Sequence, residues 1–151
     1  MTNGPANFQR LGAVSNAHAG NEFEGFAKRY FALLHIVLTP NIGVEVGVGE
    51  LKKIHRFDLG SENPAVIVEC KSHNWTNGGN VPSAKIAVWN EAMFYFHLAP
   101  DRYRKILFTL KSVRRGESLA SYYVRSFGHL IPSGVEVWEY DAAHHSAERL
   151  S

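Results

Sequence analysis

Asp58 and the tripeptide Glu69-Cys70-Lys71 are the residues of this sequence best suited to chemistry. The turn-forming residues Glu62-Asn63-Pro64 lie between them, which predicts that the chain returns antiparallel and brings Asp58 beside the tripeptide. Residues two apart in a strand face the same side, so the Glu and the Lys project together while the Cys faces away. Two carboxylates and a lysine in one place are the minimal set for metal-assisted hydrolysis of a phosphodiester.

The ligands in this set are all oxygen atoms. A divalent ion held by Asp58, Glu69 and the backbone carbonyl of Cys70 would neutralise charge on the phosphoryl group. Mg²⁺ suits such a set because it binds through one or two carboxylates and keeps several waters, and Mn²⁺ is expected to substitute. Lys71 would orient or deprotonate the attacking water and contact the scissile phosphate. Taken alone, Glu69 and Lys71 also fit an ion pair at a strand end, contributing about 0 to 1 kcal/mol.

The hydrophobic pattern predicts the elements that must position these residues. Apolar positions at helical spacing predict helices over 21–38, 83–98 and 117–126, and apolar runs or alternation predict strands over 44–48, 54–60, 65–71, 106–110 and 135–140. Asn21 and Ser83 are the predicted N-caps of the first two helices, and Pro40 is expected to stop the first. The order α-β-β-β-α-β-α-β predicts an α/β fold with a mixed central sheet flanked by helices.

Residues 1–18 lack such a pattern and are predicted to form a flexible N-terminal arm, which leaves a single domain over 19–151. Two histidines at 144–145 are expected in a mobile C-terminal tail. Cys70 is expected to point into the core and to pack as a small apolar side chain.

The chain resembles the PD-(D/E)xK superfamily, the restriction-endonuclease-like nucleases. Asp58, the apolar strand Val66-Ile67-Val68 and Glu69-Cys70-Lys71 match its motif, with Phe57 in place of the usual proline. The segment Gly20-Asn21-Glu22-Phe23-Glu24 is similar to the first helix of archaeal Holliday-junction resolvases, in which a Phe-Glu pair supplies a further acidic residue. Glu24 matches that position, and Glu22 is the alternative.

The resemblance covers about residues 20–110 and implies a restriction-endonuclease-like αβββαβ core around a metal site. It implies a Mg²⁺-dependent DNA endonuclease, either restriction-type or structure-specific, that leaves a 5′-phosphate and a 3′-hydroxyl. The catalytic residues would be Asp58, Glu69, Lys71 and Glu24, with Glu24 binding a second metal ion or an outer-shell water. The alternative is a non-catalytic nucleic-acid-binding or assembly protein on the same fold.

Composition limits the other functional classes. One cysteine in 151 residues excludes an internal disulfide framework and fits the reducing cytoplasm. No apolar stretch approaches the roughly 20 residues of a membrane helix, and no Walker-type glycine loop is present, so neither a membrane nor a nucleotide cofactor is expected. DNA is the expected partner. A double-strand cut would most simply use a homodimer, for which the apolar helix 83–98 is the expected interface.

Several side chains have two open interpretations. The basic residues of one C-terminal stretch either line a phosphate-binding face or cover a solvated surface: Arg102, Arg104, Lys105, Lys111, Arg114, Arg115 and Arg125. His73 and Trp75 either touch substrate or pack the loop against the domain. Asn90 and Glu91 face either the active site or solvent, and Lys85 is either a phosphate contact or a solvated lysine.

Overall fold

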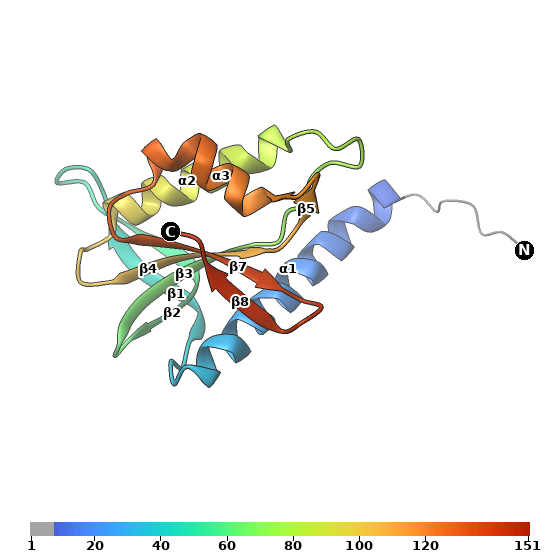
Figure 1. Cartoon of the computed structure of the whole chain (residues 1–151). Helices are drawn as coiled ribbons and strands as arrows, with labels where there is room; N and C mark the ends of the chain where they lie inside the picture. Colours follow the sequence, from blue (N-terminus) through green and yellow to red (C-terminus); the bar gives the residue numbers. More distant parts are fainter. Residues whose placement is uncertain (1–7) are drawn as a thin grey trace, which may run out of the picture.

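The fold is α/β, with helices on both faces of a six-stranded mixed sheet (Figure 1). The computed structural model describes residues 8–151, and the side chains of residues 17–151. Its elements are α1 (Phe8–Leu33), β1 (Thr39–Val46), β2 (Lys53–Glu62), β3 (Ala65–Lys71), α2 (Ser83–Leu98), β4 (Arg104–Leu110), β5 (Val113–Arg114), β6 (Glu117–Ser118), α3 (Leu119–Phe127), the 3-10 turn η1 (Gly128–Leu130), β7 (Val135–Asp141) and β8 (Ser146–Arg149).

The large sheet has the strand order β1-β2-β3-β4-β7-β8. Neighbouring strands are antiparallel except for β3, β4 and β7, which run parallel to one another. Parallel strands need long crossover connections, and here α2 links β3 to β4 while α3 links β4 to β7. The predicted fold class and order of main elements are therefore confirmed. The β5–β6 hairpin and β8 come in addition to them.

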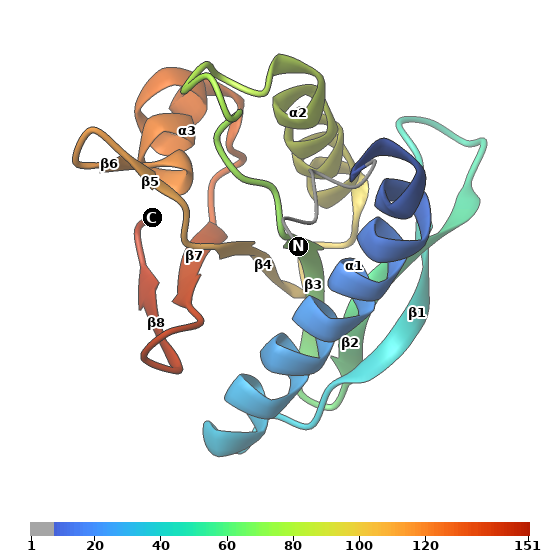
Figure 2. The ribbon, with the colours of Figure 1, turned by 90° about the vertical axis from the view of Figure 1, so that its right-hand side faces the viewer.

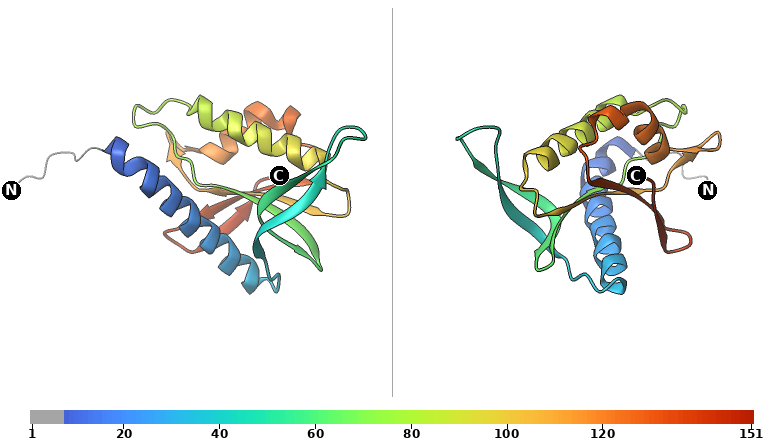
Figure 3. Two further views of the ribbon diagram at one scale, coloured as in Figure 1. Left: turned by 180° about the vertical axis from the view of Figure 1, so that it is seen from behind. Right: turned by 60° about the vertical axis from the view of Figure 1, so that its left-hand side comes forward.

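The helices cover the sheet as two separate layers (Figure 2). On one face, α1 packs Phe23, Ala27 and Phe31 against Val66, Val68 and Phe108. On the other face, α2 and α3 pack Trp89, Met93, Phe96 and Tyr123 against Ile67, Leu107 and Val137. Because both faces are covered, β3 and β4 each contain a run of consecutive apolar residues, 65–68 and 106–108, rather than alternating ones. The β1–β2 hairpin projects beyond this sandwich at one edge of the sheet (Figure 3).

The first helix starts earlier than the sequence predicts. It begins at Phe8, so the part of the predicted arm from Phe8 to His18 is helical, while residues 1–7 of that arm lie outside the described residues. Asn21 lies inside the helix and is not its N-cap. The sequence does not reveal this earlier start because the first turns of α1 extend past the sheet (Figure 1), where no apolar stripe is required.

The first helix also ends earlier, at Leu33 rather than near Leu38. His35 has φ 62° and takes the left-handed position that closes a helix. The N–H of Ile36 donates to the carbonyl of Phe31 at 2.9 Å, and that of His35 to Ala32 at 3.0 Å, which is a Schellman ending. A glycine usually takes this position, so the sequence gives no stop signal there, and Pro40, the predicted stop, lies in β1.

Other boundaries differ by smaller amounts. β1 starts at Thr39 instead of 44, and α2 has the predicted bounds but no side-chain cap from Ser83, because its N-cap position is Pro82. His144 and His145 lie at the turn between β7 and β8 rather than in a tail. Each has a hydrogen-bond partner there, His144 with Asp141 at 2.8 Å and His145 with the Tyr140 hydroxyl at 3.2 Å. Within residues 8–151, no helix is long and apolar enough to cross a membrane.

Candidate active site

The two strands that carry the predicted residues separate at one point. The register of β2 with β3 ends at Leu59 opposite Val68, although β2 starts at Lys53 and β3 continues to Lys71. Beyond that last pair, β2 stays paired with β1 and β3 with β4. Asp58 and Glu69 are the first residues past it, one on each strand. We refer to this opening, bounded by Asp58 and by Glu69–Lys71, as the fork.

Asp58 bridges the fork. The backbone N–H of Cys70 donates to its Oδ2 at 2.8 Å, so the carboxylate satisfies a buried donor that a neighbouring strand would otherwise pair. The Cys70 side chain packs in the cluster under α1, as predicted. Burial, followed by the nearby carboxylates of Asp58, Glu24 and Glu69, raises the pKa of the thiol well above its ordinary value.

The strand beside Asp58 is irregular at the same level. Asn41 has φ 59°, and the pair that it would form with Asp58 is missing between Pro40–Leu59 and Ile42–Phe57. Asparagine tolerates this left-handed conformation better than most residues do. At the same level β2 changes the face that it presents to each helix layer. Phe57 packs under α2, whereas Leu59, two residues later, packs under α1. Asp58 therefore stands where β2 changes face, and its side chain is half-buried.

Glu24 of α1 lies close to Asp58. Both residues line a hollow of about 240 Å³ together with Asn41, Arg56 and Phe57. Burial and then the charge of Asp58 raise the pKa of Glu24, while Lys71 opposes them. Glu22 is exposed and lies about 200° away around the helix, so Glu24 is the acidic residue of this helix that reaches the fork.

Glu69 is only 6% exposed and has a basic partner on each carboxylate oxygen. Lys71 Nζ donates to Oε2 at 3.3 Å, and Nε2 of His55 lies 3.3 Å from Oε1. Burial, and next the charge of Asp58, raises the pKa of Glu69 to about 8, although Lys71 lowers it. In the absence of a metal ion, this carboxyl therefore carries a proton at neutral pH.

His55 is a functional candidate that the sequence reasoning missed. Its ring stacks on Tyr95 of α2, with 3.6 Å between ring centroids and 11° between ring planes, so the imidazole is fixed in place. Alternation along the predicted strand 54–60 puts His55 on the same face as Phe57, and that was the only available signal. Its contact with Glu69 is made by side chains across the fork, beyond the last β2–β3 pair, and the local sequence does not encode such a contact.

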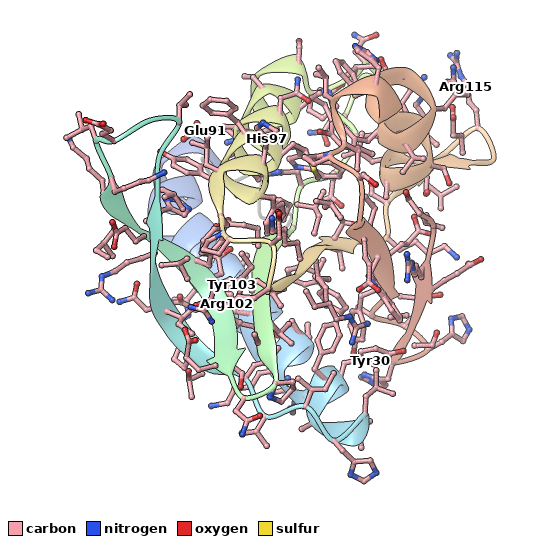
Figure 4. The ribbon with its side chains drawn as sticks, turned by 90° about the vertical axis from the view of Figure 1, so that its left-hand side faces the viewer. Tyr30, Glu91, His97, Arg102, Tyr103 and Arg115 are labelled. Atoms are coloured by element: carbon pink, nitrogen blue, oxygen red, sulfur yellow. The ribbon has the colours of Figure 1, made fainter. Side chains whose placement is uncertain are left out.

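The packing of α2 places Asn90 and Glu91 differently, and Glu91 is exposed to solvent. Glu91 lines a hollow of about 110 Å³ with His55, Glu69 and Lys71. Figure 4 labels it on the flank of α2 that faces the β1–β2 hairpin. Asn90 instead accepts a hydrogen bond from the Tyr123 hydroxyl at 2.9 Å and so faces α3.

The predicted residues come together at the fork, but they line two different hollows. Glu24 and Asp58 line one, and Glu69 and Lys71 line the other. Among the described side chains, no three histidine, cysteine or acidic groups stand together as a ready-made metal-binding set. The donors nevertheless fit a hard divalent ion, since they are oxygens whose charges act on one another through Asp58. Mg²⁺ needs only one or two carboxylates, with waters completing its shell.

The basic C-terminal stretch does not form one phosphate-binding face. At the start of β4, Arg102 pairs with Glu62, Arg104 with Glu136, and Lys105 donates to the Ala99 carbonyl. Arg115 follows the far end of β4, well separated from Arg102 (Figure 4). Trp75 is 8% exposed and packs the loop to the domain: its backbone N–H donates to Ser112 Oγ at 3.2 Å and its Nε1 to the Glu117 carbonyl at 3.3 Å.

Comparisons of the chain with family models, with curated proteins and with solved structures found no match. The case for a function therefore rests on the residues and geometry of the fork.

Proposed function

We propose that this protein is a Mg²⁺-dependent DNA endonuclease that hydrolyses phosphodiester bonds at the fork, leaving a 5′-phosphate and a 3′-hydroxyl. One observation carries the proposal: three elements bring Glu24, Asp58 and Glu69 to the fork beside Lys71. Glu24 and Asp58 line one hollow, Asp58 accepts from the Cys70 N–H at 2.8 Å, and Glu69 and Lys71 line the adjoining hollow. The order α1-β1-β2-β3-α2-β4 agrees with the αβββαβ core of the restriction-endonuclease-like nucleases that the sequence resembles.

Asp58, Glu69 and the Cys70 carbonyl would hold the ion. When bound, Mg²⁺ or Mn²⁺ supplies neutralisation of the phosphoryl oxygens and a water of lowered pKa. Asp58 has a second role, because its bond to the Cys70 N–H fixes the backbone whose carbonyl is the third ligand. Two carboxylates and a carbonyl match the preference of Mg²⁺ for oxygen donors.

Lys71 is the residue proposed to position the attacking water and to contact the scissile phosphate. Its ammonium is held by Glu69 at 3.3 Å and its side chain is largely covered, so it presents a fixed donor with little conformational freedom left to lose. Glu24, next to Asp58, would orient a second water or ion. His55 would fix the orientation of the Glu69 carboxylate from the opposite side.

Cleavage assays test the proposal. Supercoiled plasmid, a four-way junction and a flap substrate are incubated with the protein in Mg²⁺, in Mn²⁺ or in EDTA. We expect metal-dependent cleavage that falls by a factor of about 10² or more in Asp58→Asn, Glu69→Gln and Lys71→Ala. Glu24→Gln should be impaired as well, whereas the matched variant Glu22→Gln should cleave like the wild type.

The substrates also separate the subclasses. Discrete plasmid fragments would indicate a restriction-type enzyme, and cleavage of branched DNA alone would indicate a structure-specific one. Full activity in the three variants at the fork would contradict the proposal. DNA binding by the wild type without cleavage in either metal would favour the non-catalytic alternative.

A further inference from the structure

A third hollow, lined mostly by polar side chains, lies beside the fork at the carboxyl end of β3. It has a volume of about 390 Å³ and is lined by Ala19, Ser72, His73, Asn74, Pro82 and Lys85. Apart from Ala19 of α1, its lining runs from Ser72, the residue that follows Lys71, to Lys85 in the first turn of α2. None of the roles proposed for the fork uses these side chains.

The protonation state of His73 follows from its neighbour. Trp89 Nε1 donates to Nδ1 of His73 at 2.8 Å, and an indole nitrogen can only donate. Nδ1 is therefore an acceptor, and the ring proton sits on Nε2, on the side of the ring away from Trp89. Burial and the charges of Lys85 and Lys71 agree with this, since they lower the pKa of His73 to about 4. His73 thus offers the hollow a neutral N–H donor.

The rest of the lining also favours an acceptor-rich anion. Lys85 brings a positive charge that acts on His73, while Ser72 and Asn74 add a hydroxyl and an amide. Among the described residues, no side-chain hydrogen bond or ion pair engages Ser72, Asn74 or Lys85, and no carboxylate lines this hollow. One cation and several neutral donors match a phosphate oxygen, which is a strong acceptor and never a donor when ionised.

The spacing from the fork suits a neighbouring phosphate of the same DNA strand. Ala19 precedes Glu24 by five residues, which is about 7.5 Å along a helix. His73 follows Lys71 by two residues, which is about 7 Å of extended chain. Both spans are upper limits on the distance between the fork and the hollow, so the hollow lies within reach of the phosphate next to one held at the fork.

We propose that Ser72, His73, Asn74 and Lys85 form a binding site for a DNA backbone phosphate adjacent to the scissile one. This site rests on the proposed function, since it assumes that DNA lies across the fork. It holds the strand in register through one charged contact from Lys85 and one neutral contact from His73 Nε2–H.

The two contacts predict different salt responses. Binding of a fluorescein-labelled duplex and of a labelled four-way junction is measured by anisotropy in EDTA at several salt concentrations. Lys85→Ala should make the slope of log affinity against log salt shallower by about 0.9, because one counterion fewer is released. His73→Asn retains an oxygen for Trp89 but lacks the Nε2–H, so affinity should fall about fivefold with an unchanged slope.

Two further variants separate binding from folding. His73→Gln places an amide N–H near the position of Nε2 and should recover part of the lost affinity. Arg102→Ala removes one positive charge from the opposite end of β4, where Arg102 is 58% exposed and pairs with Glu62, and should bind like the wild type. Near-ultraviolet circular dichroism confirms that each variant is folded.

The proposed site would be overturned by unchanged affinity and slope in Lys85→Ala and His73→Asn, by an equal effect of Arg102→Ala, or by a wild type that binds neither DNA. Failure of the proposed function looks different. If the wild type never cuts in Mg²⁺ or Mn²⁺ but the variants show these effects on binding in EDTA, the proposed nuclease activity is contradicted while the phosphate site is supported.

Discussion

At the scale of single residues, the surroundings of Glu69 have opposing effects on its pKa. It is buried, faces Asp58, and yet has Lys71 and His55 on its two oxygens. Burial and Asp58 prevail, so the pKa of Glu69 is raised to about 8. The folded protein without metal therefore holds a proton that the unfolded chain has already released at neutral pH.

This proton makes stability depend on pH in a defined window. A pKa raised from 4.5 to about 8 stabilises the fold at low pH, and that contribution is lost as pH rises towards 8. The pKa values of His55 and His73 are lowered from 6.5. These two residues therefore make stability rise with pH, but only below pH 6.5. Between pH 6.5 and 8, in EDTA, urea unfolding should show stability falling by about 1 to 2 kcal/mol. Glu69→Gln should remove this dependence, and a wild-type profile that stays flat would contradict it.

His55 is predicted to act through Glu69 rather than on substrate. His55→Ala leaves one oxygen of a ligand carboxylate without its partner, which for such supporting residues typically lowers metal affinity or activity by about 10- to 100-fold. The Mg²⁺ concentration for half-maximal cleavage should rise, while DNA affinity in EDTA should not change. Tyr95→Phe keeps the stacked ring and serves as the control. A change in DNA affinity alone would argue for direct substrate contact instead.

At the scale of elements, the fork requires that β2 lie tightly between β1 and β3 just before the strands separate. Gly60 is the residue there, and a Cβ on it would meet the backbone oxygen of Val66 at 2.8 Å and Ile42 Cγ2 at 2.5 Å. A backbone atom inside a sheet cannot move aside as a flexible side chain can. Glycine at this position is therefore a packing requirement and not a turn signal.

Gly60→Ala should destabilise the protein by about 2 kcal/mol or more, because it forces β2 away from β3. Gly49→Ala is the matched control, since nothing lies within 4 Å of a Cβ at that position in the β1–β2 loop. Urea unfolding of both variants checks the difference. Equal stabilities would mean that the strands can separate without cost, and the fork would then not be a fixed structure.

Sequence predicts the elements well where burial imposes a period. The apolar runs of β3 and β4 and the bounds of α2 follow directly from the two covered faces of the sheet. The sequence does not predict an element where no characteristic residue marks it. His35 ends α1 in a position that glycine usually takes, and β8, which pairs with β7, is a short polar segment. The site divides in the same way. Asp58, Glu69 and Lys71 follow from strand periodicity, whereas His55 depends on a side-chain contact across the unpaired fork.

At the scale of the whole molecule, each chain supplies one fork, and a duplex has two strands to cut. If the protein acts as proposed, a single chain nicks, and a double-strand cut requires a second chain. On supercoiled plasmid, the rate of nicking should rise with the first power of protein concentration, and the rate of linear product formation should rise more steeply. Gel time courses over a concentration series measure both rates. Linear product formed at a constant ratio to nicked circles would indicate a preformed dimer.

Trp75 has a consequence for the energetics of association. It fastens the loop after β3 to the β5–β6 hairpin through hydrogen bonds to Ser112 and Glu117, and the Arg114 guanidinium lies over its ring at 4.3 Å. The neighbouring His73 is held as well, because Trp89 Nε1 donates to its Nδ1 at 2.8 Å. Ordering a side chain on binding costs about 0.5 to 1.5 kcal/mol, and for His73 most of that entropy loss is already incurred during folding. If DNA binds at this edge of the sheet as proposed, His73 contributes a preorganised donor with little conformational entropy left to lose.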